Sequence, residues 1–272
     1  MEVPTTSTTP MSMHSNKPED MMHISRIPRF LRWVVAVWLA MFCLVAQGKV
    51  FLVSVGIADY PGTRIDLRVP ARDAKTISLI YYKNSPMKYR QLLDDKATEK
   101  NILNAMKELY AQAGEDDVVV FFFSGHGFRG GFYIYDGSLW YDQIRKAMAA
   151  SKCKNKMIFA DACYSGTIRT AERVDTTAID HEAEMKKSNI MLFLSSRGNE
   201  VSLERPDMKN GYFTTYLGKG LKGAADANRD RVITARELYD YVHNGVVDLS
   251  KGMQHPVMWG NFPDEMIVMK WN

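Results

Sequence analysis

The sequence predicts an α/β fold in which helices cover both faces of a mainly parallel central sheet. Short apolar runs, of the kind that strands show when both of their faces are buried, recur along the chain. Segments with apolar residues at helical spacing separate these runs. Strands and helices that alternate in this way are typical of parallel sheets. With 272 residues, of which 46% are hydrophobic, the chain is long enough for one large domain.

Residues 1–48 are expected to form a leader that precedes a domain at 49–272. Residues 1–20 are rich in Thr, Ser, Pro and Met without an apolar period, so we expect them to be disordered. A basic segment then precedes the apolar run 33–46, and Ala46-Gln47-Gly48 offers the small residues that a signal peptidase needs. This order predicts a secretory signal and hence a secreted or periplasmic domain. The alternative is an uncleaved membrane anchor that continues into the next apolar segment.

The first half of the domain alternates strands with helices. The apolar run 49–56 predicts a buried strand. Residues 69–83 show helical spacing, with Pro70 and Asp73 near the start of the helix. A short strand at 89–93 and a helix over 97–112 follow.

Two apolar runs with similar endings occupy the middle of the domain. The first, from Asp117 to Gly127, ends in Ser-Gly-His-Gly. A glycine-rich turn, a hairpin arm in the sequence FYIYDG and a helix over 139–150 come next. The second run predicts a strand at 157–160 that ends on Asp161, Ala162 and Cys163.

The last third returns to the same alternation after a long loop. Residues 167–189 are charged and aperiodic, which predicts a loop without regular structure. We expect a buried strand at 189–196, helices over 212–221 and 234–246, and a final strand at 265–271.

His126 and Cys163 each follow one of the two middle strands. If these strands are neighbours in one parallel sheet, both residues emerge at its carboxyl edge, where such sheets bind their ligands. A thiol beside an imidazole is the minimum equipment of a cysteine nucleophile. A cysteine after an apolar strand is also often a small buried hydrophobe, and a single histidine there is often an ordinary loop residue. The residues alone leave both interpretations open.

The two motifs resemble the histidine and cysteine motifs of caspase-like cysteine peptidases, in particular metacaspases and their bacterial relatives. The resemblance runs from about Lys49 to the C-terminus. It implies a caspase-like fold and an endopeptidase with Cys163 as the nucleophile and His126 as the acid and base. It also implies that the backbone N–H groups of Cys163 and Gly127 bind the oxyanion of the tetrahedral intermediate.

The resemblance also implies a preference for basic substrates. Caspases have a glutamine two residues before the nucleophile, whereas this chain has Asp161. In metacaspase-like proteins the matching aspartate shares the substrate pocket with a second aspartate, matched by Asp73, and a serine, matched by Ser124. Two carboxylates in one pocket repel each other unless a cation pairs with them, so we expect cleavage after Arg or Lys. The alternative for Asp73 is a favourable charge in the first turn of a helix.

Residues 226–237 fit the pattern of a calcium loop. The ligand positions are matched by Asp226, Asn228, Asp230 and Glu237. Arg231 stands where the sharp turn of such a loop requires glycine. The alternative is a polar turn with Asp and Asn as caps. Calcium dependence also occurs among metacaspases, so Ca²⁺ is a candidate ion, although the dyad chemistry requires no cofactor.

The expected partners are protein or peptide substrates with a basic residue before the cleaved bond. The loop after the nucleophile carries basic residues that offer sites for self-cleavage, unless it is only a solvated charged loop: Arg169, Arg173, Lys186 and Lys187. The net charge is only +4 and the basic residues are dispersed, so we expect no nucleic-acid partner. A membrane is a partner only if the N-terminal segment stays uncleaved.

Other hydrolase classes lack their motifs in this chain. The sequence has no Gly-x-Ser-x-Gly elbow, no phosphate loop with Lys-Ser/Thr and no His-Glu-x-x-His pair. One alternative is a non-catalytic binding protein of the same fold with a vestigial Cys/His pair. Another is an arginine- or asparagine-specific peptidase of the same broad fold, which would differ only in its substrate pocket.

Overall fold

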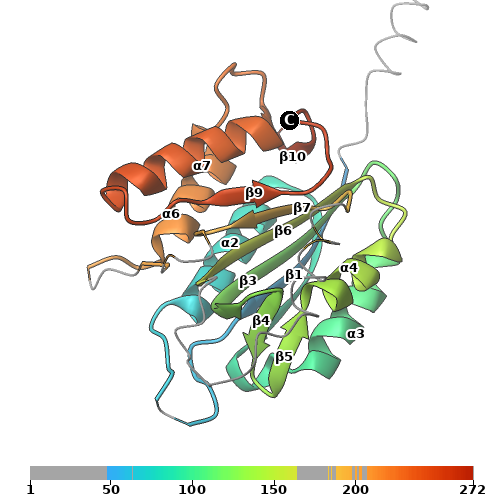
Figure 1. Ribbon diagram of the computed structural model, residues 1–272. Coiled ribbons are helices and arrows are strands. Elements are labelled where there is room, and N and C mark those ends of the chain that lie inside the picture. The colour runs from blue at the N-terminus through green and yellow to red at the C-terminus, as the bar shows by residue number, and fades with distance from the viewer. Residues whose placement is uncertain are drawn as a thin grey trace, which may run out of the picture. The chain divides into compact units, whose positions relative to one another are not determined.

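The computed structural model confirms the predicted fold class (Figure 1). It describes residues 48–271 except for residues 63, 164–182, 184, 186–187, 198–199, 201 and 204–206. The predicted leader therefore lies outside the described residues, and its two interpretations stay predictions. None of the helices in the described part has the length and hydrophobicity needed to cross a bilayer.

The central sheet has eight strands, most of them parallel. Its main path runs in the order β2 (Met87–Leu93), β1 (Val50–Gly56), β3 (Val118–Phe128), β6 (Asn155–Cys163), β7 (Met191–Leu194) and β9 (Val257–Trp259). The first five are parallel to their neighbours, and β9 is antiparallel to β7. The predicted hairpin arm belongs to an antiparallel extension of β3, made by β4 (Gly131–Ile134) and β5 (Gly137–Trp140).

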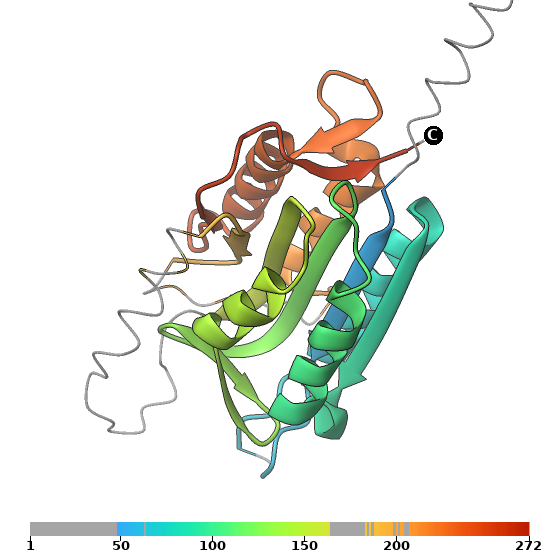
Figure 2. The ribbon, with the colours of Figure 1, turned by 90° about the vertical axis from the view of Figure 1, so that its right-hand side faces the viewer.

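Two hydrophobic cores cover the two faces of the sheet. Phe121 and Phe123 of β3 point to the core that contains α3 (Glu99–Tyr110) and α4 (Tyr141–Ala149). These two helices lie side by side in Figure 2. Val120 and Phe122 alternate with those phenylalanines and point to the other core. That core contains α2 (Pro70–Asn84), α6 (Tyr212–Lys219) and α7 (Ala235–Leu249).

Local sequence signals explain where the helices begin. Pro70 occupies the first turn of α2, where its missing N–H costs nothing. The Thr98 side chain accepts a hydrogen bond from the Asn101 N–H and caps α3. Thr234 and Glu237 form a reciprocal capping box at the start of α7. The predicted helix starts therefore agree with the structure to within about two residues.

The two middle strands are longer than their apolar runs predict. β6 continues to Cys163 and β3 continues through His126 to Phe128, because the parallel ladder between them extends over the small and polar residues. The candidate catalytic residues thus lie within strands rather than after them.

The predicted final strand exists but does not join the central sheet. It is β10 (Ile267–Lys270), which pairs antiparallel with β8 (Val232–Thr234) in a separate ribbon. Neither β8 nor β9 was predicted, because a strand of three residues is too short to show a period.

Candidate active site

The candidate nucleophile and base lie on adjacent strands at the carboxyl edge of the parallel sheet. β3 and β6 are neighbours, and their register pairs His126 directly with Cys163. The prediction that the two strands are adjacent is therefore confirmed. Neighbouring strands lie about 4.8 Å apart, so the two backbones hold these residues next to each other. Ser124 and Asp161 form another pair of the same ladder, two residues earlier.

A backbone carbonyl holds the imidazole of His126. Its Nε2 lies 2.6 Å from the carbonyl oxygen of Ile65. Because a carbonyl oxygen only accepts hydrogen bonds, Nε2 carries the proton in the neutral ring, and Nδ1 is the basic nitrogen. An imidazole with one nitrogen fixed in this way can use the other to take a proton from a thiol.

Tyr60 holds the backbone of His126. The His126 N–H donates to the Tyr60 hydroxyl oxygen at 2.9 Å, and that hydroxyl donates to the carbonyl oxygen of Tyr133 at 3.2 Å. The rings of Tyr60 and His126 pack with their centroids 5.0 Å apart. Burial raises the pKa of Tyr60, so the hydroxyl keeps its proton and makes both hydrogen bonds.

Two glycines flank His126 and have different surroundings. At Gly125 an added Cβ would lie 2.6 Å from the Tyr60 hydroxyl oxygen, and the φ angle of +156° is one that side chains rarely adopt. Glycine at this position therefore gives Tyr60 its access to the His126 backbone. Gly127, the predicted oxyanion donor, follows His126 in β3 and is paired with Phe132 of β4.

Asp73 lies in the first turn of α2 and is fully buried. Its Oδ2 accepts a hydrogen bond from the Ser124 hydroxyl at 2.9 Å. Its Oδ1 accepts from the Asn210 side-chain amide at 2.7 Å and from the Gly211 N–H at 3.3 Å. The structure therefore brings Asp73 and Ser124 together. A favourable first-turn charge alone would not explain why the carboxyl group is buried.

Asp161 is buried on β6 and has its own set of donors. Its Oδ2 accepts from the backbone N–H and the hydroxyl of Thr214 at 3.0 and 2.8 Å, and its Oδ1 accepts from the Ser202 hydroxyl at 2.5 Å. Gly211 lies between the two carboxyl groups. Its N–H donates to Asp73, while an added Cβ would lie only 2.4 Å from Asp161 Oδ2. We call Asp73 and Asp161 the acidic pair.

Burial and mutual repulsion disfavour the charged forms of the acidic pair. Burial raises the pKa of both carboxyl groups, and the negative charge of Asp161 raises the pKa of Asp73 further. Their hydrogen bonds act in the opposite direction but do not reverse the shift. A bound guanidinium or ammonium group would relieve the repulsion and favour the charged form of both acids.

Ser195 supports the segment of β6 that carries Cys163. Its hydroxyl accepts a hydrogen bond from the Ala162 N–H at 3.1 Å and donates to the Ala162 carbonyl oxygen at 2.9 Å. The buried Gln254 side chain donates in turn to the Ser195 carbonyl oxygen at 2.8 Å. Both polar backbone groups of the residue before Cys163 therefore contact one side chain.

Sequence reasoning missed the residues that hold the predicted ones. Ile65 acts through its carbonyl group, which every residue has, so no pattern could have identified it. Asn210 and Gly211 precede α6, where small polar residues signal a helix start without indicating a pocket. No sequence pattern indicated that Ser202 or Thr214 belongs to the site.

The predicted calcium loop folds as a turn rich in side-chain-to-backbone hydrogen bonds. Asp226 accepts from the Arg231 N–H at 3.1 Å, and Asp230 accepts from the Val232 N–H at 2.8 Å. Arg231 has a φ angle of +66°, the left-handed conformation that glycine would otherwise supply. Among the described residues, no group of three or more His, Cys, Asp or Glu side chains is placed to hold a metal ion. The turn interpretation accounts for these contacts, and calcium binding stays a prediction.

Several predicted features lie outside the described residues. The proposed self-cleavage sites are among them: Arg169, Arg173, Lys186 and Lys187. The buried Cys153 is described and has a free thiol.

Comparisons with known proteins agree with this fold. The family model of the caspase domain matches residues 50–267. Among solved structures, protein GSU0716 from Geobacter sulfurreducens is 18% identical and superposes with a TM-score of 0.61, covering 82% of this chain and 97% of its own. Caspase-1 from Spodoptera frugiperda is 14% identical with a TM-score of 0.59, covering 83% of this chain and 92% of its own. At such identities the structural likeness concerns the fold alone. No curated protein matches the sequence.

Proposed function

Because this chain belongs to the caspase family of cysteine peptidases, we propose that it is an endopeptidase that cleaves after Arg or Lys with Cys163 and His126 as its catalytic pair. The observation that carries this proposal is the register that pairs the two residues on β3 and β6, together with the Ile65 carbonyl at Nε2 of His126.

The proposed reaction follows from that arrangement. His126 takes the thiol proton on Nδ1, and the Cys163 thiolate attacks the carbonyl carbon of the substrate. The backbone N–H groups of Cys163 and Gly127 are proposed to stabilise the resulting oxyanion. The imidazolium then protonates the departing amine, the acyl group stays on sulfur, and water releases it in a second attack assisted by His126.

The acidic pair supports the proposed preference for basic residues. Asp161 lies two residues before Cys163 on the same strand, so a substrate side chain that reaches Asp161 is attached close to the bond under attack. A guanidinium or ammonium group placed there would pair with carboxyl groups whose pKa values are raised by burial. A neutral or acidic side chain would leave their repulsion unrelieved.

Peptide cleavage by the full chain tests this proposal. Fluorogenic peptides that end in Arg, Lys, Asp or Asn are offered to the wild type and to Cys163→Ala and His126→Ala. We expect Arg and Lys peptides to be cleaved by the wild type only. We expect Asp161→Asn to lower kcat/KM for Arg peptides by about 100-fold, since a buried charge pair is worth about 2–5 kcal/mol. The matched control is Asp264→Asn, which removes an exposed carboxylate that pairs with Arg236.

The same assay separates the alternatives. Cleavage of Asn or Asp peptides in place of Arg and Lys peptides would overturn the basic specificity and retain the peptidase. The absence of cleavage of every peptide would favour the non-catalytic binding protein with a vestigial Cys/His pair. A Cys163 thiol that alkylates no faster than a free cysteine would point the same way.

The calcium loop is proposed on its sequence pattern and on the left-handed conformation of Arg231. Titration of the full chain with calcium chloride, compared with Asp230→Asn and with the Asp264→Asn control, tests it. Heat of binding lost in the first variant alone would support the site. Equal heats in all three proteins would leave the loop as a polar turn.

Export is proposed on the N-terminal sequence, with a secreted or periplasmic location. Mass spectrometry of the protein recovered from its own cells tests it. A mature chain that begins at Lys49 would support the signal, whereas an intact N-terminus in the membrane fraction would favour the anchor.

A further inference from the structure

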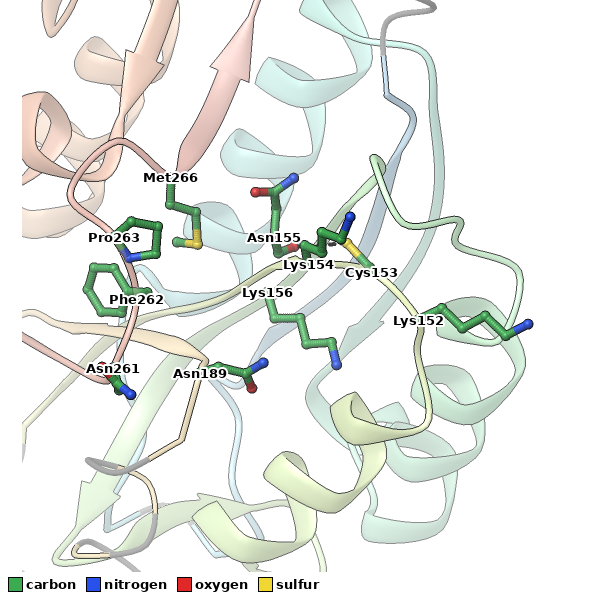
Figure 3. Close-up of a pocket in the computed structure, with 10 residues that line it drawn as sticks. All are labelled: Lys152, Cys153, Lys154, Asn155, Lys156, Asn189, Asn261, Phe262, Pro263 and Met266. Atoms are coloured by element: carbon green, nitrogen blue, oxygen red, sulfur yellow. Dashed lines mark hydrogen bonds between the residues drawn. The ribbon is translucent and has the colours of Figure 1, made fainter.

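A cavity opens at the edge of the sheet opposite to Cys163. Its volume is about 390 Å³, and its wall includes the start of β6, the residue Asn189 before β7 and the segment 261–266 (Figure 3). Lys156 is the second residue of β6 and Cys163 is the last. Seven residues of extended strand span about 23 Å, so this cavity is not part of the candidate active site.

The cavity wall contains a lysine that has no counter-charge among the described residues. Its side chain is mostly covered, while its ammonium group is not among the fully buried polar atoms. Lys156 is only 7% exposed, yet its ammonium group makes no ion pair or hydrogen bond within the described part of the chain. Burial lowers the pKa of this group, which reflects the cost of an unpaired charge. No Asp or Glu lines the cavity. An anion from outside the chain would supply the missing partner.

The neighbours of Lys156 are suited to the same ligand. Asn189 and Asn261 also line the cavity, and their side-chain amides have no partner among the described residues. In Figure 3 the Lys156 side chain runs downward from β6 and away from Phe262, Pro263 and Met266, and Asn189 lies to the left of its end. Lys154 differs from Lys156, because it is exposed and forms an ion pair with Glu115 at 2.9 Å.

The other wall of the cavity is apolar. Phe262, Pro263 and Met266 lie together on one side of the opening in Figure 3. A ligand that satisfies both walls has a negatively charged end and an apolar body. Lys152 and Lys154 also line the cavity, but both are exposed, and Lys154 is paired with Glu115. A carboxylate, which has one negative charge, therefore matches Lys156, and the amides can donate to its oxygens.

We propose that this cavity binds a small organic carboxylate, which pairs with Lys156 and places its apolar part against Phe262 and Pro263. The proposal concerns binding alone and does not depend on the peptidase activity.

The test follows 4-fluorobenzoate by ¹⁹F NMR as the full chain is added. We expect saturable binding to the wild type that acetate displaces only at a higher concentration, because acetate lacks the apolar body. Lys156→Met keeps the length of the side chain and removes the charge, so we expect binding at least about tenfold weaker. Lys154 lines the same cavity, and Lys154→Met should bind 4-fluorobenzoate with an affinity within about threefold of that of the wild type.

Three results would overturn the proposal. The first is the absence of saturable binding to the wild type, and the second is an unchanged affinity in Lys156→Met. The third is displacement by inorganic phosphate at lower concentration than by acetate, which would assign the site to phosphates. Because Lys156→Met removes a charge without a partner from a mostly covered side chain, its fold should persist, and a thermal melt checks this. Sodium chloride at the same ionic strength as the competing salts is the control, because it shows how far charge screening alone weakens the binding.

Discussion

At the scale of single residues, the candidate site depends on contacts that leave no room for substitution. Gly125 lets the Tyr60 hydroxyl reach the His126 backbone, and Gly211 lets the two members of the acidic pair approach one backbone segment. In both cases the absent side chain matters as much as the side chains that are present.

We predict that Gly125→Ala displaces Tyr60 and costs about 1–3 kcal/mol of unfolding free energy. Peptidase activity should fall as well, because His126 loses a backbone contact. Urea unfolding and kcat/KM measure the two effects. Gly137→Ala is a close control, since Gly137 has a φ of +153° but nothing within 4 Å of an added Cβ. Equal losses in both variants would show that backbone strain alone acts at position 125.

We predict that Asp73 makes stability depend on pH. Its pKa in the folded protein is raised above the ordinary value of 3.8, so folding favours the protonated acid. The contribution of Asp73 to stability is complete below pH 3.8 and is lost as the pH rises through the raised pKa. Asp73→Asn should therefore gain relative to the wild type, by up to about 1.4 kcal/mol per pH unit within that range. Urea unfolding at a series of pH values gives the unfolding free energy of the wild type and of Asp73→Asn. A difference between the two proteins that does not change with pH would contradict the prediction.

At the scale of elements, strand order and loop contacts decide what the site residues can do. The sequence predicted the strands that carry His126 and Cys163, because their apolar runs are long and continuous. It could not predict that residues between β7 and the first turn of α6 would hold the acidic pair, because those contacts depend on the packing of distant segments. The strands β8 and β9 were not predicted for a simpler reason, because three residues are too few to show a period.

We predict that Ser195→Ala lowers kcat more than it changes KM. The hydroxyl of Ser195 holds the Ala162 backbone and not the substrate, so its loss should disturb the position of Cys163. The expected cost in stability is about 1–3 kcal/mol, because two buried backbone groups lose a partner. Ser54→Ala removes another buried hydroxyl, bonded to Ala74 within the α2 face, and should leave kcat unchanged. A change confined to KM in Ser195→Ala would contradict the positioning role.

At the scale of the whole molecule, the alternation of apolar residues on the strands divides the interior into two cores. The fold class was predictable because strand-like and helix-like segments alternate along the whole domain. The separate ribbon of β8 and β10 was not, since its residues join the α2 face without entering the central sheet.

We predict that this ribbon is essential for stability. Met269 of β10 is buried in the same core as α2, and its sulfur accepts a hydrogen bond from Ser85. Met269→Ala should cost about 2–5 kcal/mol in urea unfolding, whereas the largely exposed Met253→Ala should stay within about 0.5 kcal/mol of the wild type. Similar costs for the two variants would mean that the ribbon is not part of the cooperative core.

The residues that support the candidate site are also synthesised after its two reactive residues. Translation produces His126 and Cys163 before it produces Ser195, Ser202, Asn210 and Thr214, which hold the strand and the pocket in place. A nascent chain that has just exposed its thiol therefore has no finished pocket to present to its neighbours. These supporting residues are complete only when about three quarters of the domain has emerged, well after its two reactive residues.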